Sequence, residues 1–151
     1  MKKCPDIMTK DPVSCAPGDT TDRAALLMKT KEIGPVPVVE NRRLVGIVTD
    51  RDLAIRVVAV GRDPKKTRVE EVMTRDVVTC RSQEDLEKAL EAMTSNQLRR
   101  IPVVDEHDQI VGMIAQADVA TSLNEPERVA EVVKEISRPG RSETVSQRGR
   151  D

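Results

Sequence analysis

The chain contains two copies of one sequence unit, and this duplication limits its fold more than any other feature. The segment DIMTKDPVSC at 6–15 matches EVMTRDVVTC at 71–80, 65 positions later. The same spacing relates PVV at 37–39 to PVV at 102–104, and after one inserted residue Val45-Gly46 matches Val111-Gly112. Because the matches keep their order and spacing along both halves, we expect two structurally equivalent modules.

Each copy predicts the element order strand, helix, strand, strand, helix. A short extended segment at 13–15 or 77–80 precedes a polar turn, after which Thr20 or Asp85 is placed to cap a helix. In the second copy, apolar residues recur at the spacing of a helix with one buried face: Leu86, Ala89, Leu90 and Met93. Two β-rich runs with a short turn between them follow, at 35–40 and 44–49 in copy one and at 100–105 and 110–115 in copy two. A second helix is expected from about residue 50 to 60 in copy one and from 116 to 123 in copy two.

One copy alone is too small to cover its own apolar sheet face, whereas two such faces can cover each other. We therefore expect an α+β, sandwich-like fold of tandem β-α-β-β-α repeats packed with pseudo-two-fold symmetry. The expected boundaries are 1–62 for repeat 1, 63–67 for a linker, 68–123 for repeat 2, 124–137 for a C-terminal helix and 138–151 for a disordered tail. The apolar stripe of the last helix needs a partner surface, either in its own module or in a second subunit: Val129, Val132, Val133 and Ile136.

The composition excludes several classes of partner. The net charge is -1, so neither nucleic acid nor a membrane surface is indicated as a bulk partner. Phe, Tyr and Trp are all absent, which removes the aromatic platforms used to bind single-stranded nucleic acid. No apolar run is long enough to span a membrane, and no signal peptide follows the N-terminal lysines, so a cytoplasmic location is expected.

Two motifs give the chain a family resemblance. They are Arg99-Arg100-Ile101-Pro102-Val103-Val104-Asp105 and Gly46-Ile47-Val48-Thr49-Asp50-Arg51-Asp52. With its paired strands, the chain resembles a CBS-domain pair, or Bateman module, over about residues 3–123, and resembles small stand-alone bacterial CBS proteins of the stress or hypoxia response. The resemblance implies a non-catalytic regulatory protein that binds AMP, ADP, ATP or S-adenosylmethionine between its two copies. It also implies a homodimer, an as yet unknown protein partner and no required cofactor.

Carried onto this sequence, the resemblance implies one strong nucleotide site and one weaker site. In the strong site Thr49 and Asp52 would meet the ribose, the early strand of copy two would flank the base and two arginines would meet phosphate: Val78, Thr79, Cys80, Arg99 and Arg100. The second, weaker site would use Ser14, Cys15 and Asp118. Ala115 stands there in place of the threonine, and Gly34-Pro35 in place of the arginines.

Simpler interpretations stay open for these residues. Thr49 and Asp52 also fit a helix cap, and Arg99 and Arg100 fit a solvated surface. Cys15 and Cys80, at equivalent positions, are expected to be small buried hydrophobes; the alternative is a redox or metal response if the pseudo-symmetry brings their sulfurs together.

The remaining candidate ligands do not predict a metal site. Cys4 is expected to be the most exposed thiol, because it lies near the N-terminus, and His107 is expected to face solvent in a hairpin turn. There is no CxxC pair and His107 is the only histidine, so no metal site is predicted.

Three functional hypotheses follow from the sequence. The first is an adenine-nucleotide sensor, and the second is a ligand-independent dimeric scaffold or stress-response protein that responds to thiol chemistry or metals. The third, an enzyme, has no support, because no Cys–His or Ser–His candidate, P-loop or clustered metal ligands are present.

Overall fold

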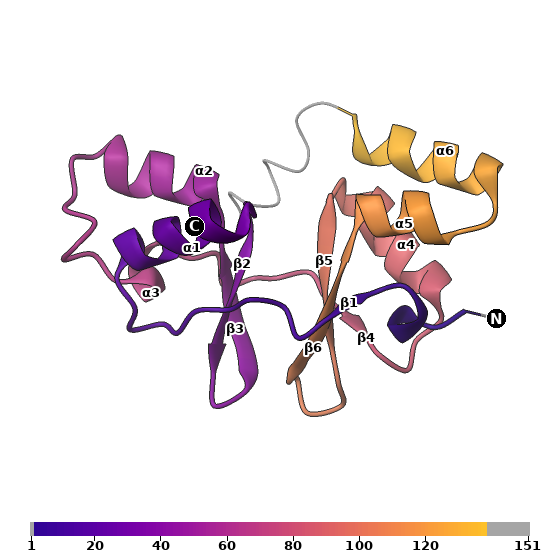
Figure 1. Cartoon of the computed structure of the whole chain (residues 1–151), viewed down its shortest axis with the longest axis horizontal. Coiled ribbons are helices and arrows are strands. Elements are labelled where there is room, and N and C mark those ends of the chain that lie inside the picture. Colours follow the sequence, from indigo (N-terminus) through magenta and orange to yellow (C-terminus); the bar gives the residue numbers. More distant parts are fainter. Residues whose placement is uncertain (1, 139–151) are drawn as a thin grey trace. The chain divides into compact units, whose positions relative to one another are not determined.

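The computed structural model describes residues 2–138 of the chain, which form an α+β fold of two compact units (Figure 1). The first unit comprises residues 13–77, and the second comprises residues 2–12 together with residues 78–138. The predicted tail lies, from residue 139 onward, outside the described residues. Between residues 2 and 138, no helix has the length and apolar character needed to cross a bilayer.

From its first helix onward, the first unit follows the predicted order of elements. These are α1 (Thr21–Lys31), β2 (Val36–Glu40), β3 (Arg43–Val48), α2 (Asp50–Leu53), the π-helical turn η2 (Ala54–Val58) and α3 (Val69–Val72). Strands β2 and β3 form an antiparallel hairpin, whose turn is closed by Asn41 and Arg42 at positive φ. The expected first strand at 13–15 is reduced to a single parallel bridge from Cys15 to Val38.

The second unit repeats this plan and adds a C-terminal helix. Its elements are η1 (Cys4–Asp6), β1 (Thr9–Lys10), β4 (Cys80–Arg81), α4 (Leu86–Asn96), β5 (Arg100–Val104), β6 (Ile110–Ala115), α5 (Gln116–Ser122) and α6 (Pro126–Ile136). The sheet has the order β1-β6-β5-β4, with β4 parallel to β5 and the other pairs antiparallel. The strand-helix-strand-strand-helix order predicted from the sequence is therefore confirmed, with β4, α4, β5, β6 and α5 in that sequence.

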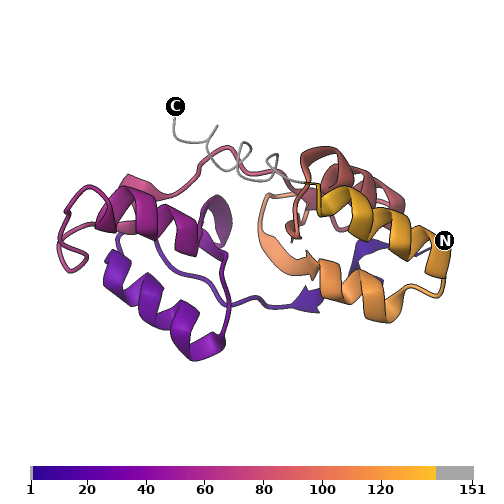
Figure 2. The ribbon, with the colours of Figure 1, turned by 90° about the horizontal axis from the view of Figure 1, so that it is seen from above.

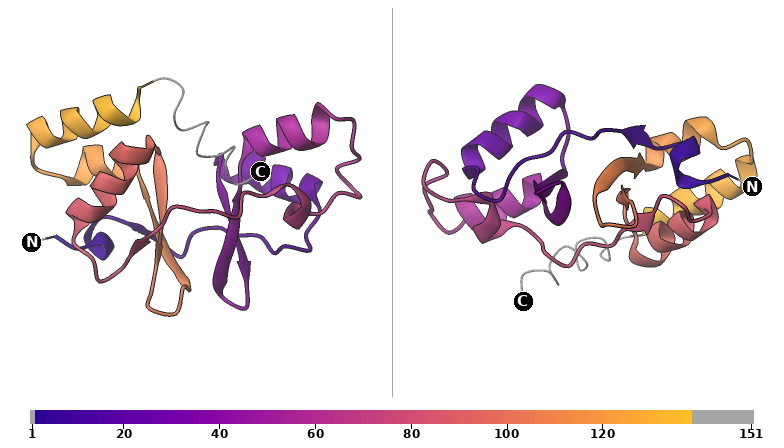
Figure 3. Two further views of the ribbon diagram at one scale, coloured as in Figure 1. Left: turned by 180° about the vertical axis from the view of Figure 1, so that it is seen from behind. Right: turned by 90° about the horizontal axis from the view of Figure 1, so that it is seen from below.

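The sheet of each unit is completed by a segment that lies, in the sequence, just before the strands and helices of the other unit. We call residues 2–12 the first arm and residues 68–77 the second arm. The first arm supplies β1, in which Thr9 pairs with Met113 of β6, and the second arm supplies Thr74, which forms an antiparallel bridge to Ile47 of β3. Figure 3 shows the indigo first arm running beside the strands and helices of the second unit.

The two arms dock through matching contacts. Lys3 forms an antiparallel bridge to Asp85 just before α4, and Arg68 forms the same bridge to Thr20 just before α1. The residue ahead of each bridge also accepts a backbone hydrogen bond: the Leu86 amide donates to the Lys2 carbonyl at 2.9 Å, and the Thr21 amide donates to the Thr67 carbonyl at 2.8 Å. The duplicated sequence therefore includes the two arms, which bind to their units through equivalent contacts.

The repeated glycines Gly46 and Gly112 make room for the arms. A Cβ atom on Gly46 would lie 2.6 Å from the Met73 sulfur and 2.9 Å from the Thr74 carbonyl oxygen. A Cβ atom on Gly112 would collide with the sulfur of Met8 in the same way. A side chain at either position would therefore push the arm away from the strand.

Helix α6 finds its partner surface within its own unit. Pro126 starts the helix, as predicted, and Val132 and Ile136 are buried in the core formed with α4 and α5. Seen from above in Figure 2, α6 (yellow) lies along these two helices. This resolves the open alternative for the apolar stripe in favour of the chain's own module.

The two aliphatic cores contain equivalent methionines. Met93 is buried, as its helical spacing predicted, and Met28 is buried at the equivalent position of the first unit. Thr20 and Asp85 are the N-cap residues of α1 and α4, but neither side chain caps the helix with a hydrogen bond. The Thr20 hydroxyl instead donates to the Asp22 carboxylate.

Candidate functional site

Thr49 and Asp52 form a reciprocal pair at the start of α2. The Asp52 amide donates to Thr49 Oγ1 at 3.1 Å, and the Thr49 amide donates to Asp52 Oδ2 at 3.0 Å. The Asp52 side chain is fully buried, whereas Thr49 is half-buried. The capping interpretation is therefore realised in the structure.

The second copy keeps only half of this arrangement. The Ala115 amide donates to Asp118 Oδ2 at 2.8 Å at the start of α5, but alanine has no hydroxyl to accept a bond from the Asp118 amide. Asp118 is also more exposed than the fully buried Asp52. The two copies therefore differ in the hydrogen bonding at the start of their second helices.

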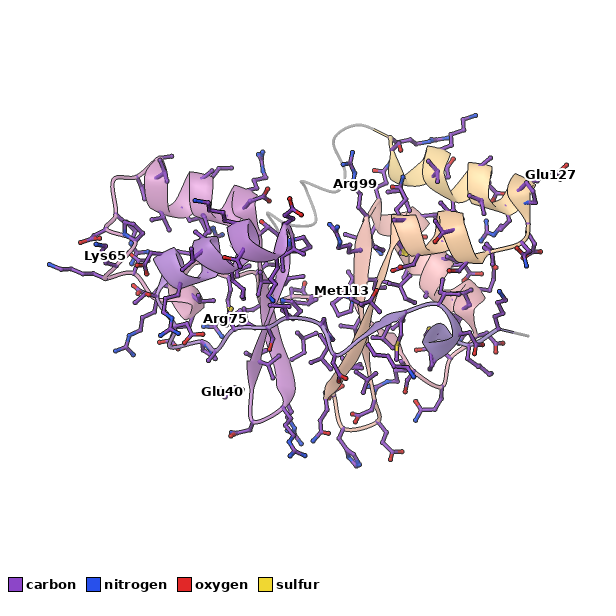
Figure 4. The ribbon with its side chains drawn as sticks, viewed as in Figure 1. Glu40, Lys65, Arg75, Arg99, Met113 and Glu127 are labelled. Atoms are coloured by element: carbon purple, nitrogen blue, oxygen red, sulfur yellow. The ribbon has the colours of Figure 1, made fainter. Side chains whose placement is uncertain are left out.

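Arg99 and Arg100 are exposed at the start of β5. Arg100 pairs with Ala115 in the β5–β6 ladder, and the Gln116 amide donates to the Arg99 carbonyl at 2.8 Å, so the two arginines lie next to the N-terminus of α5. Figure 4 shows the Arg99 side chain projecting from this end of the strand. Within residues 2–138 neither guanidinium has an ion-pair or side-chain hydrogen-bond partner.

The strand segments predicted to flank a base have one buried and one exposed member in each copy. Thr79 and Ser14 are exposed, whereas Cys80 and Cys15 are buried. Val78 is half-buried against the core of the second unit. Burial confirms the expectation that both cysteines are small core residues.

The predicted strong site draws on both units. Thr49 and Asp52 belong to the first unit, whereas the other five residues belong to the second: Val78, Thr79, Cys80, Arg99 and Arg100. Within the second unit, Cys80 pairs with Val103 of β5, the strand that begins at Arg100. The weaker site is divided likewise, with Ser14 and Cys15 in the first unit and Asp118 in the second.

The expectation that Cys4 is an exposed thiol is wrong. Cys4 is fully buried, and its sulfur lies 3.6 Å from the sulfur of Cys80. The physical reason is the docking of the first arm, which places the first residue of η1 in the core of the second unit. The repeat register carries a signal for this burial, because it equates Cys4 with Val69, a buried residue at the start of α3.

The cysteines differ in acidity. Burial raises the pKa of the Cys15 thiol to about 12. For the close pair, the hydrogen bond between the sulfurs lowers the pKa of Cys4, while that bond and burial raise the pKa of Cys80. Cys4 is therefore the more readily ionised member of the pair.

The one histidine lies away from the buried core. His107 is exposed in the β5–β6 turn, as predicted, beside Glu106 at 3.5 Å. Across residues 2–138, no three His, Cys, Asp or Glu side chains come together as a metal site would require.

Comparison with known proteins identifies the repeat. The sequence model of the CBS domain matches residues 5–59 and again residues 69–125. The chain is 38% identical over 137 residues to the CBS domain-containing protein YhcV of Bacillus subtilis, covering 91% of this chain and 96% of YhcV.

Solved structures agree with this match. The crystal structure of Hypoxic Response Protein I with two coordinated zinc ions superimposes with a TM-score of 0.74 at 31% identity, over 81% of this chain and 99% of that one. CBSX2 in complex with AMP superimposes with a TM-score of 0.69 at 25% identity, over 89% of this chain and 99% of CBSX2. On the family match, the relatives and the fold, the chain belongs to the CBS domain family and carries two copies of the domain.

Proposed function

We propose that this protein is a non-catalytic sensor that binds an adenine nucleotide with residues of both repeats. The ligand class is AMP, ADP, ATP or S-adenosylmethionine. The observation that carries the proposal is the pair Arg99 and Arg100, which is exposed and has no internal anionic partner within the described residues. Similarity to CBSX2, which was crystallised with AMP, supports the adenine class.

Each part of the proposed site has a matching group on the ligand. Guanidinium groups form charge-assisted and bidentate hydrogen bonds with phosphate. Val78 would pack on one face of the purine, in a chain that has no aromatic ring to stack on it. The Asp52 carboxylate is fully buried, so its proposed contact with ribose requires the groups that cover it to move.

Equilibrium dialysis of the purified chain tests this proposal. The absence of Phe, Tyr and Trp makes nucleotide absorbance easy to read, because the protein contributes little at those wavelengths. We expect one nucleotide per chain, with retention lost in Arg100→Ala and weakened in Asp52→Asn. The matched control is Asp118→Asn, which alters the equivalent aspartate of the second copy and should leave retention unchanged.

The proposal would be abandoned if none of the four ligands were retained at millimolar concentration. It would also fail if Asp118→Asn and Arg100→Ala weakened binding equally, because Asp118 is not part of the proposed strong site and Arg100 is.

A second candidate function is a dimeric interaction scaffold that needs no nucleotide. It is favoured by exposed apolar side chains of the first unit, at 61% for Leu26 of α1, 75% for Val58 and 64% for Val60. Under this hypothesis, light scattering gives a stable dimer without nucleotide, and Val58→Lys returns it to a monomer. A monomer in the unaltered chain would remove the scaffold hypothesis and leave the sensor hypothesis standing.

A further inference from the structure

The sulfurs of Cys4 and Cys80 form a buried pair that the nucleotide proposal does not use as a pair. They lie 3.6 Å apart, and the exposed fractions of Cys4 and Cys80 are 0% and 3%. A disulfide bond is about 2.05 Å long, so the two atoms are already in contact and need only a small approach to bond. Their other polar contacts are weak, from the Cys4 sulfur to the Glu84 carbonyl and from the Cys80 sulfur to the Pro102 carbonyl, each at 3.8 Å.

The pair joins two segments that are far apart in the sequence. Cys4 is the first residue of η1 in the first arm, and Cys80 is the first residue of β4, 76 positions later. A bond between them would fasten the first arm to the sheet that it completes. The arm would then be held covalently as well as by its backbone hydrogen bonds.

The first repeat contains a natural comparison for this pair. Cys15 is equivalent to Cys80, but the position equivalent to Cys4 is occupied by Val69. Cys15 and Val69 are both buried in the core of the first unit. The two arms dock alike, but the first unit has a valine side chain where the second unit has the Cys4 thiol.

The first arm is short and most of its residues face solvent. Lys3, Pro5 and Asp6 around Cys4 are exposed. The regular secondary structure around Cys4 is the three-residue 3-10 helix η1. Local opening of so small an element exposes the Cys4 thiol without unfolding the rest of the unit. Of the two thiols, Cys4 also has the lower pKa, which suits it to attack an oxidant first.

We propose that Cys4 and Cys80 are a redox modification site, at which a peroxide or a small-molecule disulfide converts the two thiols into a reversible internal disulfide. With hydrogen peroxide, the Cys4 thiolate attacks one oxygen and becomes a sulfenic acid, and the other oxygen leaves as hydroxide, which takes up a proton to form water. The Cys80 sulfur then attacks the Cys4 sulfur and releases the second water, so two thiols and one peroxide give one disulfide and two waters. With a small disulfide, the two thiols are oxidised and two small thiols are released.

Peptide mapping of the full-length chain tests the site, because trypsin separates the three cysteines. Cys4, Cys15 and Cys80 fall on peptides 4–10, 11–23 and 76–81. The reduced protein is treated with hydrogen peroxide or oxidised glutathione, blocked with N-ethylmaleimide and digested. We expect a loss of two mass units before blocking. After blocking and digestion, peptide 4–10 should be joined to peptide 76–81 and peptide 11–23 should be alkylated. In a parallel sample, dithiothreitol added before the blocking step should restore all three thiols.

Thermal unfolding provides a second measurement. Closing so long a loop restricts the unfolded chain, and the bridge should raise Tm by on the order of 10 °C. Cys4→Ala and Cys80→Ala should each abolish both the bridge and the shift, whereas Cys15→Ala should preserve them. Bridges between chains, a bridge to Cys15, or three free thiols after treatment with both oxidants would overturn the proposal.

Val69→Cys offers a gain-of-function test, in which one small buried side chain replaces another and both native partners of the proposed bridge are kept. It gives Cys15 the partner that Cys80 already has, so peptide 11–23 should become joined to peptide 69–75 on oxidation. A folded variant that forms no second bridge would show that arm docking does not explain the pairing. None of these outcomes depends on nucleotide binding. The disulfide proposal and the nucleotide-sensor proposal are therefore tested independently of each other.

Discussion

The Asp52 amide donates to Thr49 Oγ1 and the Thr49 amide donates to Asp52 Oδ2, so these two residues close the N-terminus of α2 from both sides. The second copy makes one of the two bonds, between the Ala115 amide and Asp118. The backbone at the two cap positions is nearly the same, with φ and ψ of -114° and 163° at Thr49 and of -107° and 157° at Ala115. At this point the second copy therefore lacks the hydroxyl acceptor that Thr49 supplies in the first copy.

Restoring that hydroxyl should stabilise the second copy. We expect Ala115→Thr to raise the free energy of unfolding by about 0.5 to 1 kcal/mol, because it supplies an acceptor for the Asp118 amide. Thr49→Ala should lower the same quantity by about 1 kcal/mol. Urea unfolding followed by circular dichroism measures both, with Ala115→Ser as a second variant that supplies a hydroxyl acceptor. Destabilisation by Ala115→Thr would contradict the shared geometry.

The glycines beneath the arms should not tolerate a side chain. We expect Gly46→Ala to lower the free energy of unfolding by about 1 to 3 kcal/mol, because its Cβ would collide with Met73 and with the Thr74 carbonyl. Gly18→Ala is the matched control, since a Cβ atom there meets no heavy atom within 4 Å. Urea midpoints that shift equally for both variants would show that the loss comes from glycine itself and not from arm docking.

Much of this fold was predictable from the sequence because the repeat fixes equivalent positions. The PVV motifs predicted β2 and β5 correctly, and the helical stripe around Met93 predicted α4. The cap at Thr49 was also one of the predicted alternatives.

The position of each arm could not be read from local pattern, because a two-residue strand such as β1 has no periodicity of its own. That is why Cys4 was expected to be exposed and is instead buried. Whether Arg99 and Arg100 serve a nucleotide together with Thr49 depends on residues of both units, and local sequence preferences carry no information on such a long-range relation.

The core contacts of α6 should make a large contribution to stability. We expect Ile136→Ala to lower the free energy of unfolding by about 2 to 5 kcal/mol, because this side chain is only 3% exposed in the core shared with α4. Val60→Ala, at a residue that is 64% exposed, should change stability by less than about 0.5 kcal/mol. Chemical denaturation of the two variants side by side checks this, and an unchanged midpoint for Ile136→Ala would contradict the assignment of α6 to its own unit.

Acid should loosen the first arm. The hydrogen bond from Lys3, at 2.5 Å, lowers the pKa of Asp85 below its ordinary value of 3.8. Because the folded-state pKa is the lower one, this contribution to stability is present above pH 3.8 and is lost as the pH falls through the folded pKa. We therefore expect the Cys4 thiol to become more accessible at acid pH.

Dithiodipyridine, which reacts with thiols in acid, measures this accessibility in a Cys15→Ala, Cys80→Ala background. Asp85→Asn removes the carboxylate, so its Cys4 should react faster at neutral pH and gain less on acidification. If the Asp85→Asn background and its parent reacted at equal rates across the pH range, Asp85 would have no part in holding the arm.

The binding of each arm to the other copy's sheet also affects the order in which the two units can fold during synthesis. The first arm leaves the ribosome before the segments to which it binds, because its binding surface includes β6, which begins at Ile110. The first arm must therefore wait for most of the chain to be synthesised before it can dock, whereas the first unit is complete once residue 77 has emerged. Synthesis on the ribosome thus closes the first unit early and leaves Cys4 open to solvent until the second unit has formed.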